Sequence, residues 1–147
     1  MTRRPSTPAE RTVGHRERVG FLLARTGRGA WLRFEQILHP LGLRPRHVVV
    51  LMELRDREAT TQQALLDDLG FDPGNLVALL NDLEERGLAE RQRDPADRRR
   101  HIVRITPRGN ARLAEADDAL ADAEEQILAS LSERQREQLR SLLGKIG

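Results

Sequence analysis

The residue types that could do chemistry are concentrated in an arginine run, Arg98-Arg99-Arg100, which directly follows Asp97. Residues 86–112 contain nine arginines and three acidic residues, a net charge of +6, although the whole chain carries only +2. Such a cluster attracts polyanions and can bind phosphate groups. The same run could instead be a solvated turn, as charge runs often are. We expect Asp97 to orient Arg99 through a charge-assisted hydrogen bond.

Few other residues of the chain could support catalysis or metal binding. There is no cysteine and no tyrosine, which excludes disulfides, thiol catalysis and Cys-ligated zinc. The four histidines are too far apart in the sequence to form a metal site within one segment. No glycine-rich phosphate loop or local Ser-His-acid motif is present. We therefore expect no enzyme activity, no cofactor and no metal.

The elements that must position the arginine run begin with two helices. The chain has 147 residues, about the length of one domain. Residues 1–14 are polar and contain two prolines, which predicts a flexible tail. Apolar residues at helical spacing predict a helix over residues 15–38, with Gly27 in its interior. Pro45 is suited to the first turn of a second helix that ends at about Arg55, although four consecutive apolar residues there could also form a buried strand.

Two shorter helices are expected next, separated by a tight turn. Thr60 and Gln63 have the spacing of a capping box, which predicts a helix that ends at Gly70. The Asp-Pro pair at residues 72–73 is typical of the start of another helix, which should end at Gly87. Helices of this length and separation are typical of a helix-turn-helix.

A hairpin is predicted directly after these helices. Residues 88–93 and the β-branched segment 101–106 are expected to be strands, joined by a polar turn over residues 94–100. A hairpin in this position is a wing, and the arginine run would lie at its tip. The residues of the wing that we expect to contact DNA are Arg93, Asp97, Arg98, Arg99 and Arg100.

The last third of the chain predicts two amphipathic helices. Apolar residues between 113 and 131 recur at intervals of 3 and 4, a nearly heptad pattern, and a final helix begins at about residue 132. A chain of this size cannot bury the apolar faces of these two helices together with the apolar face of residues 15–38. We therefore expect residues 15–43 and 107–147 to form a helical dimerisation region of a homodimer. Residues 44–106 would form a winged helix-turn-helix domain, in a fold that is mainly α (α+β).

Three segments carry a family likeness: 83–91 (LEERGLAER), 94–100 (DPADRRR) and 102–109 (IVRITPRG). Together with the order of helices, they resemble the MarR (multiple antibiotic resistance regulator) family of bacterial transcription factors. The resemblance implies a homodimer of winged helix-turn-helix subunits that binds a pseudo-palindromic operator in double-stranded DNA. It also implies a repressor that a small aromatic or anionic ligand releases.

The expected recognition helix departs from the usual family pattern. Positions that often carry hydroxyl groups and an arginine hold Gly74, Asn75, Val77 and Ala78 here. Base reading is then expected from Asn75 and Asn81, because the amide of asparagine can pair bidentately with adenine. Attraction to phosphates would shift to the wing. A further expected DNA contact is Gln62.

A ligand site is expected where the first two helices meet the long helix that follows the wing. The resemblance and a local mix of aromatic, apolar and basic groups indicate this place. Taken alone, His47 is better interpreted as a helix cap or a satisfied surface histidine, and Trp31 and Phe34 as part of the core of the dimerisation region. The expected ligand contacts are Trp31, Phe34, Arg46, His47 and Met52.

No apolar run is long enough to span a membrane, and the N-terminus lacks the apolar region of a secretory signal. We therefore expect a cytoplasmic protein without a membrane partner. The alternative function is a winged-helix module that contacts other proteins and does not bind DNA specifically.

Overall fold

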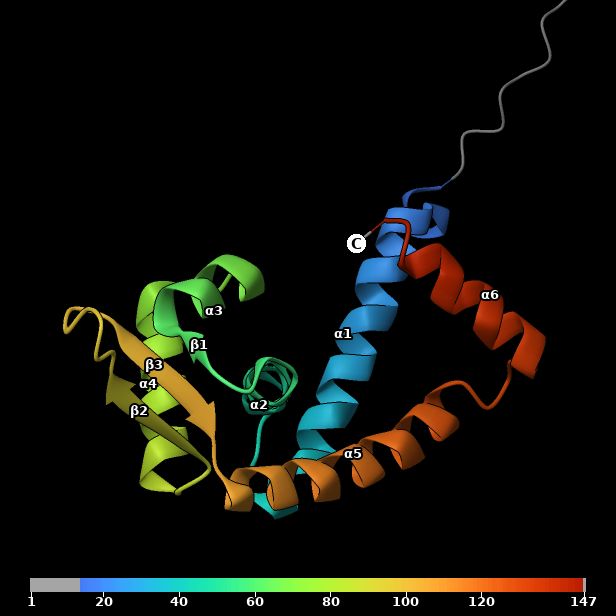
Figure 1. Ribbon diagram of the computed structural model, residues 1–147. Helices are drawn as coiled ribbons and strands as arrows, with labels where there is room; N and C mark the ends of the chain where they lie inside the picture. The colour runs from blue at the N-terminus through green and yellow to red at the C-terminus, as the bar shows by residue number, and fades with distance from the viewer. Residues whose placement is uncertain (1–13, 147) are drawn as a thin grey trace, which may run out of the picture.

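The computed structural model describes residues 14–146 and is mainly helical, with one small antiparallel sheet. In Figure 1, α5 runs between the β2–β3 hairpin on one side of the molecule and α1 and α6 on the other. Among the described residues, no helix is long and apolar enough to cross a membrane. The elements in chain order are η1 (His15–Glu17), α1 (Val19–Leu38), η2 (His39–Leu41), α2 (Pro45–Arg57), β1 (Thr60–Thr61), α3 (Gln62–Leu69), α4 (Pro73–Glu85), β2 (Ala89–Arg93), β3 (His101–Ile105), α5 (Pro107–Ile127) and α6 (Glu133–Leu143).

The first two long helices agree with the prediction in type and differ from it at their ends. α1 continues through Gly27 without a break, but it begins at Val19, because residues 15–17 form a separate 3-10 turn. α2 begins at Pro45 as expected and extends to Arg57, so the buried-strand alternative is wrong. The predicted tail lies outside the described residues except for Gly14.

The start of α3 differs from the predicted capping box. The N-cap is Thr61, whose hydroxyl oxygen accepts the backbone N–H of Ala64 at 3.1 Å. Thr60 instead pairs with Val103 in the short strand β1. Because Thr60 takes part in the sheet, the cap moves one residue along the chain, and Gln63 no longer occupies the N3 position of a capping box.

The turn between the two helices of the helix-turn-helix lies where it was predicted. Gly70, at a φ of 60°, terminates α3 in the left-handed conformation that glycine readily adopts. Asp72 then caps α4 by accepting the backbone N–H of Asn75 at 3.2 Å. These local contacts direct α4 away from α3 at a tight turn.

The wing is present as a hairpin of β2 and β3, each one residue shorter than predicted. The sheet order is β1-β3-β2 with antiparallel pairing, and the hairpin register runs from Ala89↔Ile105 to Arg93↔His101. Thr106 joins the wing to α5, because its hydroxyl donates to the carbonyl of Gly87 at 2.6 Å. The fold class, a mainly α winged helix-turn-helix with N- and C-terminal helices, is confirmed.

The hydrophobic core lies in the winged helix-turn-helix and the first half of α5. α1 adds Leu38 to this core, and none of the residues of α6 is buried. The apolar side chains of α1 and α6 therefore remain largely exposed in the single chain. The largest fully buried side chains after Leu38 are Leu51, Leu54, Leu65, Leu76, Leu80, Leu83, Leu113, Val50 and Val103.

α5 ends at Ile127, four residues before the predicted end. Beyond it, the guanidinium of Arg136 donates to the backbone carbonyls of Leu128 and Leu131 at 3.1 and 3.2 Å. The same group pairs with Glu125 at 2.6 Å. Arg136 thus satisfies carbonyls that the end of a helix leaves free, and it fixes α6 against the end of α5.

Candidate nucleic-acid interface

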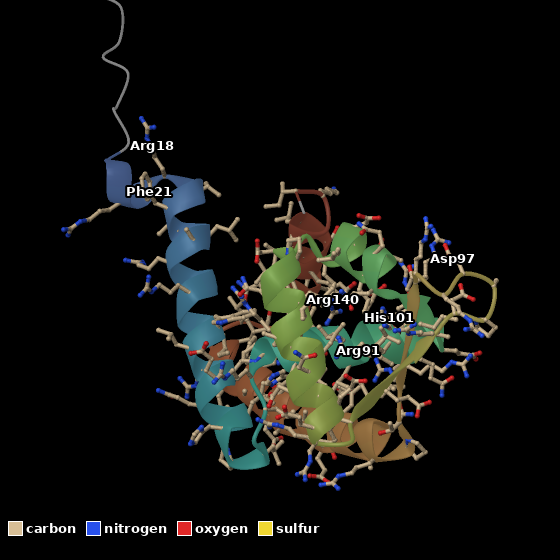
Figure 2. All side chains as sticks on the ribbon, turned by 90° about the vertical axis from the view of Figure 1, so that its left-hand side faces the viewer. Arg18, Phe21, Arg91, Asp97, His101 and Arg140 are labelled. Atoms are coloured by element: carbon tan, nitrogen blue, oxygen red, sulfur yellow. The ribbon has the colours of Figure 1, made fainter. Side chains whose placement is uncertain are left out.

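The exposed surface of α4 is the first part of the candidate interface. Leu76, Leu80 and Leu83 face the core, whereas Asn75 and Asn81 are exposed on the other side of the helix. α4 is the second helix of the helix-turn-helix, the position of a recognition helix that enters the major groove. Figure 2 views the molecule from the side on which α4 lies, with Arg91 next to it.

The two asparagines predicted to read bases have different surroundings. The side-chain amide of Asn75 makes no hydrogen bond within residues 14–146. The amide oxygen of Asn81 accepts a hydrogen bond from the guanidinium of Arg91 on β2. Glu84 holds that guanidinium, with its second carboxylate oxygen 2.8 Å from the Nε of Arg91. The bidentate pairing of Asn81 with adenine stays a prediction, since the amide oxygen has a second lone pair, but the contact with Arg91 fixes the orientation of the amide.

Sequence reasoning did not identify the Glu84–Arg91 contact. The backbone N–H of Arg91 also donates to Glu84, at 2.9 Å, so β2 is fastened to α4 through both its backbone and a side chain. Seven positions separate the two residues, and the intervening segment leaves α4 and enters a strand. The i, i+3 and i, i+4 spacings of side-chain pairs on one helix therefore could not have predicted the contact.

In the turn of the wing, the hydrogen bond of Asp97 differs from the predicted one. The carboxylate of Asp97 accepts the backbone N–H of Arg99 at 3.0 Å, and no ion pair joins the two side chains among the described residues. Asp94 acts in the same way at the start of the turn and accepts the N–H of Ala96 at 2.9 Å. Short acidic side chains favour such local bonds to the backbone. The predicted bond to the guanidinium of Arg99 is wrong, and Asp97 shapes the turn instead.

The basic segment separates into paired and unpaired arginines. Three of its nine arginines form ion pairs: Arg86 with Asp82, Arg91 with Glu84, and Arg112 with Glu115. The other six are exposed and make no ion pair within residues 14–146. Their charge is therefore available to an external anion. These six arginines, here called the wing cations, are Arg93, Arg98, Arg99, Arg100, Arg104 and Arg108.

Gln62 lies at the first position of α3 and is half-buried. The expected ligand residues have different surroundings. Trp31 is 39% exposed, and its indole N–H donates to Glu35 at 3.2 Å, within α1. Arg46 lies over the ring of Phe71, 5.7 Å from its centroid.

His47 and Met52, the other two residues of α2 that were expected to contact a ligand, also have different surroundings. Met52 is 39% exposed. His47 is buried, and its ring accepts the backbone N–H of Arg44, so the helix-cap alternative is the correct one. Burial lowers the pKa of His47 below its ordinary value, and the positive charges of Arg86 and Arg44 act in the same direction against Asp82.

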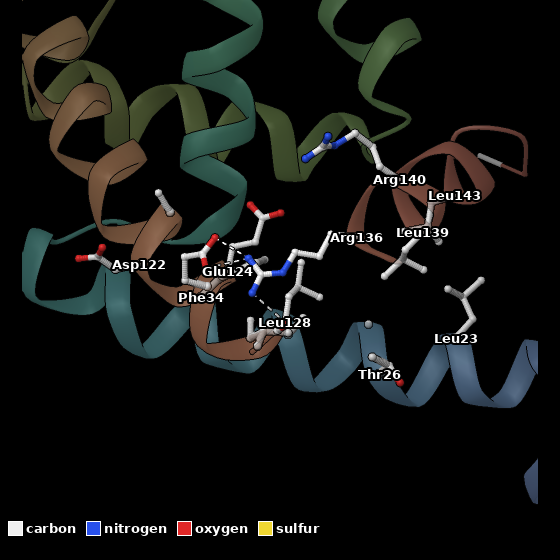
Figure 3. A pocket seen from close by; sticks show the side chains of 15 residues that line it. Leu23, Thr26, Phe34, Asp122, Glu124, Leu128, Arg136, Leu139, Arg140 and Leu143 are labelled. Carbon is white, nitrogen blue, oxygen red and sulfur yellow. Dashed lines mark hydrogen bonds and ion pairs between the residues drawn. The ribbon is translucent and has the colours of Figure 1, made fainter. Parts of the chain in front are cut away.

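A cavity of about 670 Å³ lies between α1, the second half of α5 and α6. Figure 3 shows Leu139 and Leu143 of α6 on the side that faces α1. Of the expected ligand residues, the cavity includes only Phe34. Three carboxylates line it, from Asp122, Glu124 and Glu125, together with the guanidiniums of Arg136 and Arg140.

Comparisons with known proteins agree with this geometry. The sequence model described as MarR family matches residues 41–100. A candidate transcriptional regulatory protein for the hcr operon of Thauera aromatica is 30% identical over 129 residues, which cover 87% of this chain and 78% of that protein.

Among solved structures, the transcriptional repressor CouR bound to a 23-mer DNA duplex is 34% identical, with a TM-score of 0.84 over 94% of this chain and 99% of that one. A mutant MarR from E. coli complexed with operator DNA is 25% identical, with a TM-score of 0.78 over 87% and 92% of the two chains.

Proposed function

The chain belongs to the MarR family of DNA-binding transcriptional regulators, and we propose that it acts as a homodimeric repressor of a pseudo-palindromic operator. A transcriptional regulator of this family is not an enzyme. Two similar structures, CouR bound to a DNA duplex and MarR complexed with operator DNA, support DNA as the partner. They favour this function over a module that contacts only proteins.

The observation that carries the proposal is the combination of the wing cations with the polar face of α4. The six guanidiniums are exposed and have no acidic partner among the described residues. Unpaired arginines supply phosphate contacts, which give affinity without sequence information. Asn75 offers a free amide on the adjacent helix, and amides read base edges in the major groove. One subunit thus presents both kinds of contact.

Fluorescence anisotropy with labelled duplexes from the region upstream of the gene tests DNA binding. Specific binding should be tighter than binding to a scrambled duplex of equal length, and its affinity should fall steeply with salt, because counterions are released from the phosphates. Equal affinity for both duplexes would favour non-specific binding, and no binding to either would overturn the proposal.

The exposed apolar side chains of α1 and α6 support a homodimer formed by residues 15–43 and 107–147. Val19 and Phe21 of α1 are 78% and 60% exposed, and Leu142 and Ile146 at the C-terminal end are 58% and 67% exposed. Large exposed apolar side chains on two neighbouring terminal helices favour an interaction site. A second copy of the chain would cover it and place two recognition helices about 34–36 Å apart, one turn of DNA.

Analytical ultracentrifugation of Phe21→Arg tests the homodimer. A charge in the apolar contact should convert the dimer to a monomer at micromolar concentration and weaken operator binding. Met52→Gln is the matched control, because Met52 is an exposed apolar side chain of α2, and it should leave the dimer intact. Leu120 would be a poor choice, since it packs against the core of its own subunit. A monomeric wild-type chain at this concentration would contradict the homodimer.

The cavity between α1, α5 and α6 supports release by a small aromatic ligand, and it gives less support to an anionic one. Arg136 pairs with Glu125 and Arg140 pairs with Glu137, so neither guanidinium is free for a ligand anion. Two further carboxylates remain on the lining. We therefore expect phenol to raise the melting temperature and release operator DNA at millimolar concentration, and benzoate to do so far less. If neither compound changes either quantity, ligand release through this cavity is wrong.

A further inference from the structure

The inner side of the recognition helix carries a contact between a carboxylate and a buried histidine that the contacts with DNA do not require. Asp82 follows the exposed Asn81 on α4 and faces inward, where its Oδ2 lies 2.8 Å from the Nε2 of His47 on α2. The side chain of His47 is only 3% exposed, whereas that of Asp82 is 36% exposed. The contact therefore joins the recognition helix directly to the first turn of α2.

Both nitrogens of the His47 ring are in use. Nδ1 accepts the backbone N–H of Arg44, the N-cap of α2, at 3.1 Å. An acceptor at Nδ1 and a contact with a carboxylate at Nε2 identify the neutral ring that carries its proton on Nε2. A second proton would have to sit on Nδ1, directly opposite the N–H of Arg44. Protonation is therefore incompatible with the cap of α2.

The other carboxylate oxygen of Asp82 extends the network to the loop before α2. Its Oδ1 accepts from the Nε of Arg86 at 3.1 Å, and Arg86 also donates to the carbonyl of Gly42. Gly42 adopts a φ of 68°, in the left-handed region, at the end of the η2 turn. α4 is thus fastened to both the loop after α1 and the start of α2.

We propose, on the basis of the proposed operator binding, that His47 is a positioning residue whose neutral imidazole holds α4 at the orientation in which Asn75 and the wing contact DNA together. The imidazole does not touch DNA in this role. It acts through Asp82, which is fixed on the same helix as Asn75. Loss of the Nδ1 acceptor or of the Nε2 donor would allow α4 to shift against α2, and operator affinity would fall.

The charges around the ring define the pH range in which the effect should appear. Asp82 of α4, Arg86 directly after α4 and Arg44 before α2 act on it, and burial is the largest influence. The pKa of His47 is lowered from the ordinary 6.5, so the ring is neutral above this pH in both the folded and the unfolded chain. Below pH 6.5 the folded state therefore binds fewer protons than the unfolded state. The stability that the neutral His47 contributes is lost as the pH falls through the pKa of His47 in the folded state.

Two substitutions separate the positioning role from a general loss of stability. His47→Gln keeps an acceptor for the N-cap, as glutamine does at this position of a capping box, keeps a donor for Asp82, and does not titrate. His47→Leu removes both. His39→Gln is the control, because His39 is exposed. Operator affinity of the full chain is measured by anisotropy from pH 8 down to the lowest pH at which the wild type stays folded, with melting temperatures at each pH.

At pH 8 we expect His47→Gln to bind like the wild type and His47→Leu to bind about tenfold more weakly, the size of effect expected when a charged group loses a buried hydrogen bond. Below pH 6.5 the wild type should lose affinity relative to His47→Gln as the ring of His47 becomes protonated, and His39→Gln should follow the wild type. NMR of the imidazole nitrogens at pH 8 should show the Nε2-protonated tautomer for His47.

Equal pH profiles for the wild type and His47→Gln would overturn the proposal, and so would wild-type affinity in His47→Leu. If His47→Leu does not fold, the comparison with His47→Gln alone decides. A wild-type chain that binds no duplex at any pH would overturn the proposed function itself, whereas normal binding at pH 8 leaves that function standing whatever the His47 variants show.

Discussion

Gly109 approaches the backbone of Leu88 so closely that a Cβ at position 109 would lie 2.0 Å from the carbonyl oxygen of Leu88. The same carbonyl accepts the N–H of Thr106 at 3.1 Å, and the hydroxyl of Thr106 accepts the N–H of Gly109 at 2.9 Å. The start of α5 is therefore pressed against the beginning of β2. This contact sets the angle between the wing and the helix that leads to the proposed dimerisation region.

Gly109→Ala should lower the free energy of unfolding by at least about 1–3 kcal/mol, the usual cost of overpacking, because the obstructing atom belongs to the backbone and cannot rotate away. Urea denaturation measures the change. Gly144→Ala is the control, since a Cβ there would lie 3.5 Å from its nearest neighbour, an ordinary contact. If both variants unfolded at the same urea concentration as the wild type, the close approach would not constrain the fold.

The order of elements around this contact could be predicted, because each of those elements has a local signal. Pro45, Gly70 and the Asp-Pro pair at residues 72–73 mark helix ends through the conformations that proline and glycine favour and the bonds that a capping aspartate accepts. β1 was missed because it has only two residues and exists through pairing with β3, more than forty residues later. That pairing also moved the cap of α3 from Thr60 to Thr61.

The candidate site could be predicted only where charge accumulates in the sequence. The wing arginines were identified from their clustering, whereas the contacts of His47 with Asp82 and of Glu84 with Arg91 depend on how helices and strands pack. The ligand residues stay a prediction for the same reason. Whether Trp31 and Met52 lie close together depends on the angles between α1, α2 and α5. The spacing of apolar residues along the sequence does not determine these angles.

Asp97→Asn should preserve operator affinity, and Asp97→Ala should weaken it. The carboxylate of Asp97 accepts a backbone N–H from Arg99, a role that the amide oxygen of asparagine can fill. Alanine has no side-chain acceptor, so the turn would loosen. Its arginines would then no longer be held where they can contact DNA together. Anisotropy titrations at one salt concentration measure the difference. A loss in Asp97→Asn as large as in Asp97→Ala would instead indicate that the negative charge itself matters.

The double variant Arg98→Ala/Arg99→Ala should bind the operator weakly and with a flatter salt dependence. If each guanidinium contacts one phosphate, the slope of log affinity against log salt should fall by about 0.9 for each residue. Arg112→Ala is the matched control, because Arg112 belongs to the same basic segment but pairs with Glu115 at 3.0 Å. Its slope should stay close to that of the wild type. An unchanged slope in the double variant would remove the wing from the interface.

Asn75 and Asn81 should differ in what they contribute to sequence preference. The amide of Asn75 can donate and accept, so it can pair with both N6 and N7 of adenine, a contact that discriminates against the wrong base by about 1–3 kcal/mol. The oxygen of Asn81 already accepts from Arg91. Its second lone pair stays available, but the contact with β2 holds the amide in one orientation, whereas the amide of Asn75 can rotate to meet a base edge.

Selection of bound duplexes from a library of operator variants measures this difference directly. Asn75→Ala should relax the preference at one base pair of each half-site and leave the salt slope nearly unchanged, as the loss of a base contact does. Asn81→Ala should lower affinity for all sequences by a similar factor. The assignment would be reversed if Asn81→Ala changed the selected sequence while Asn75→Ala did not, and the contact between Arg91 and Asn81 would then have to break when DNA binds.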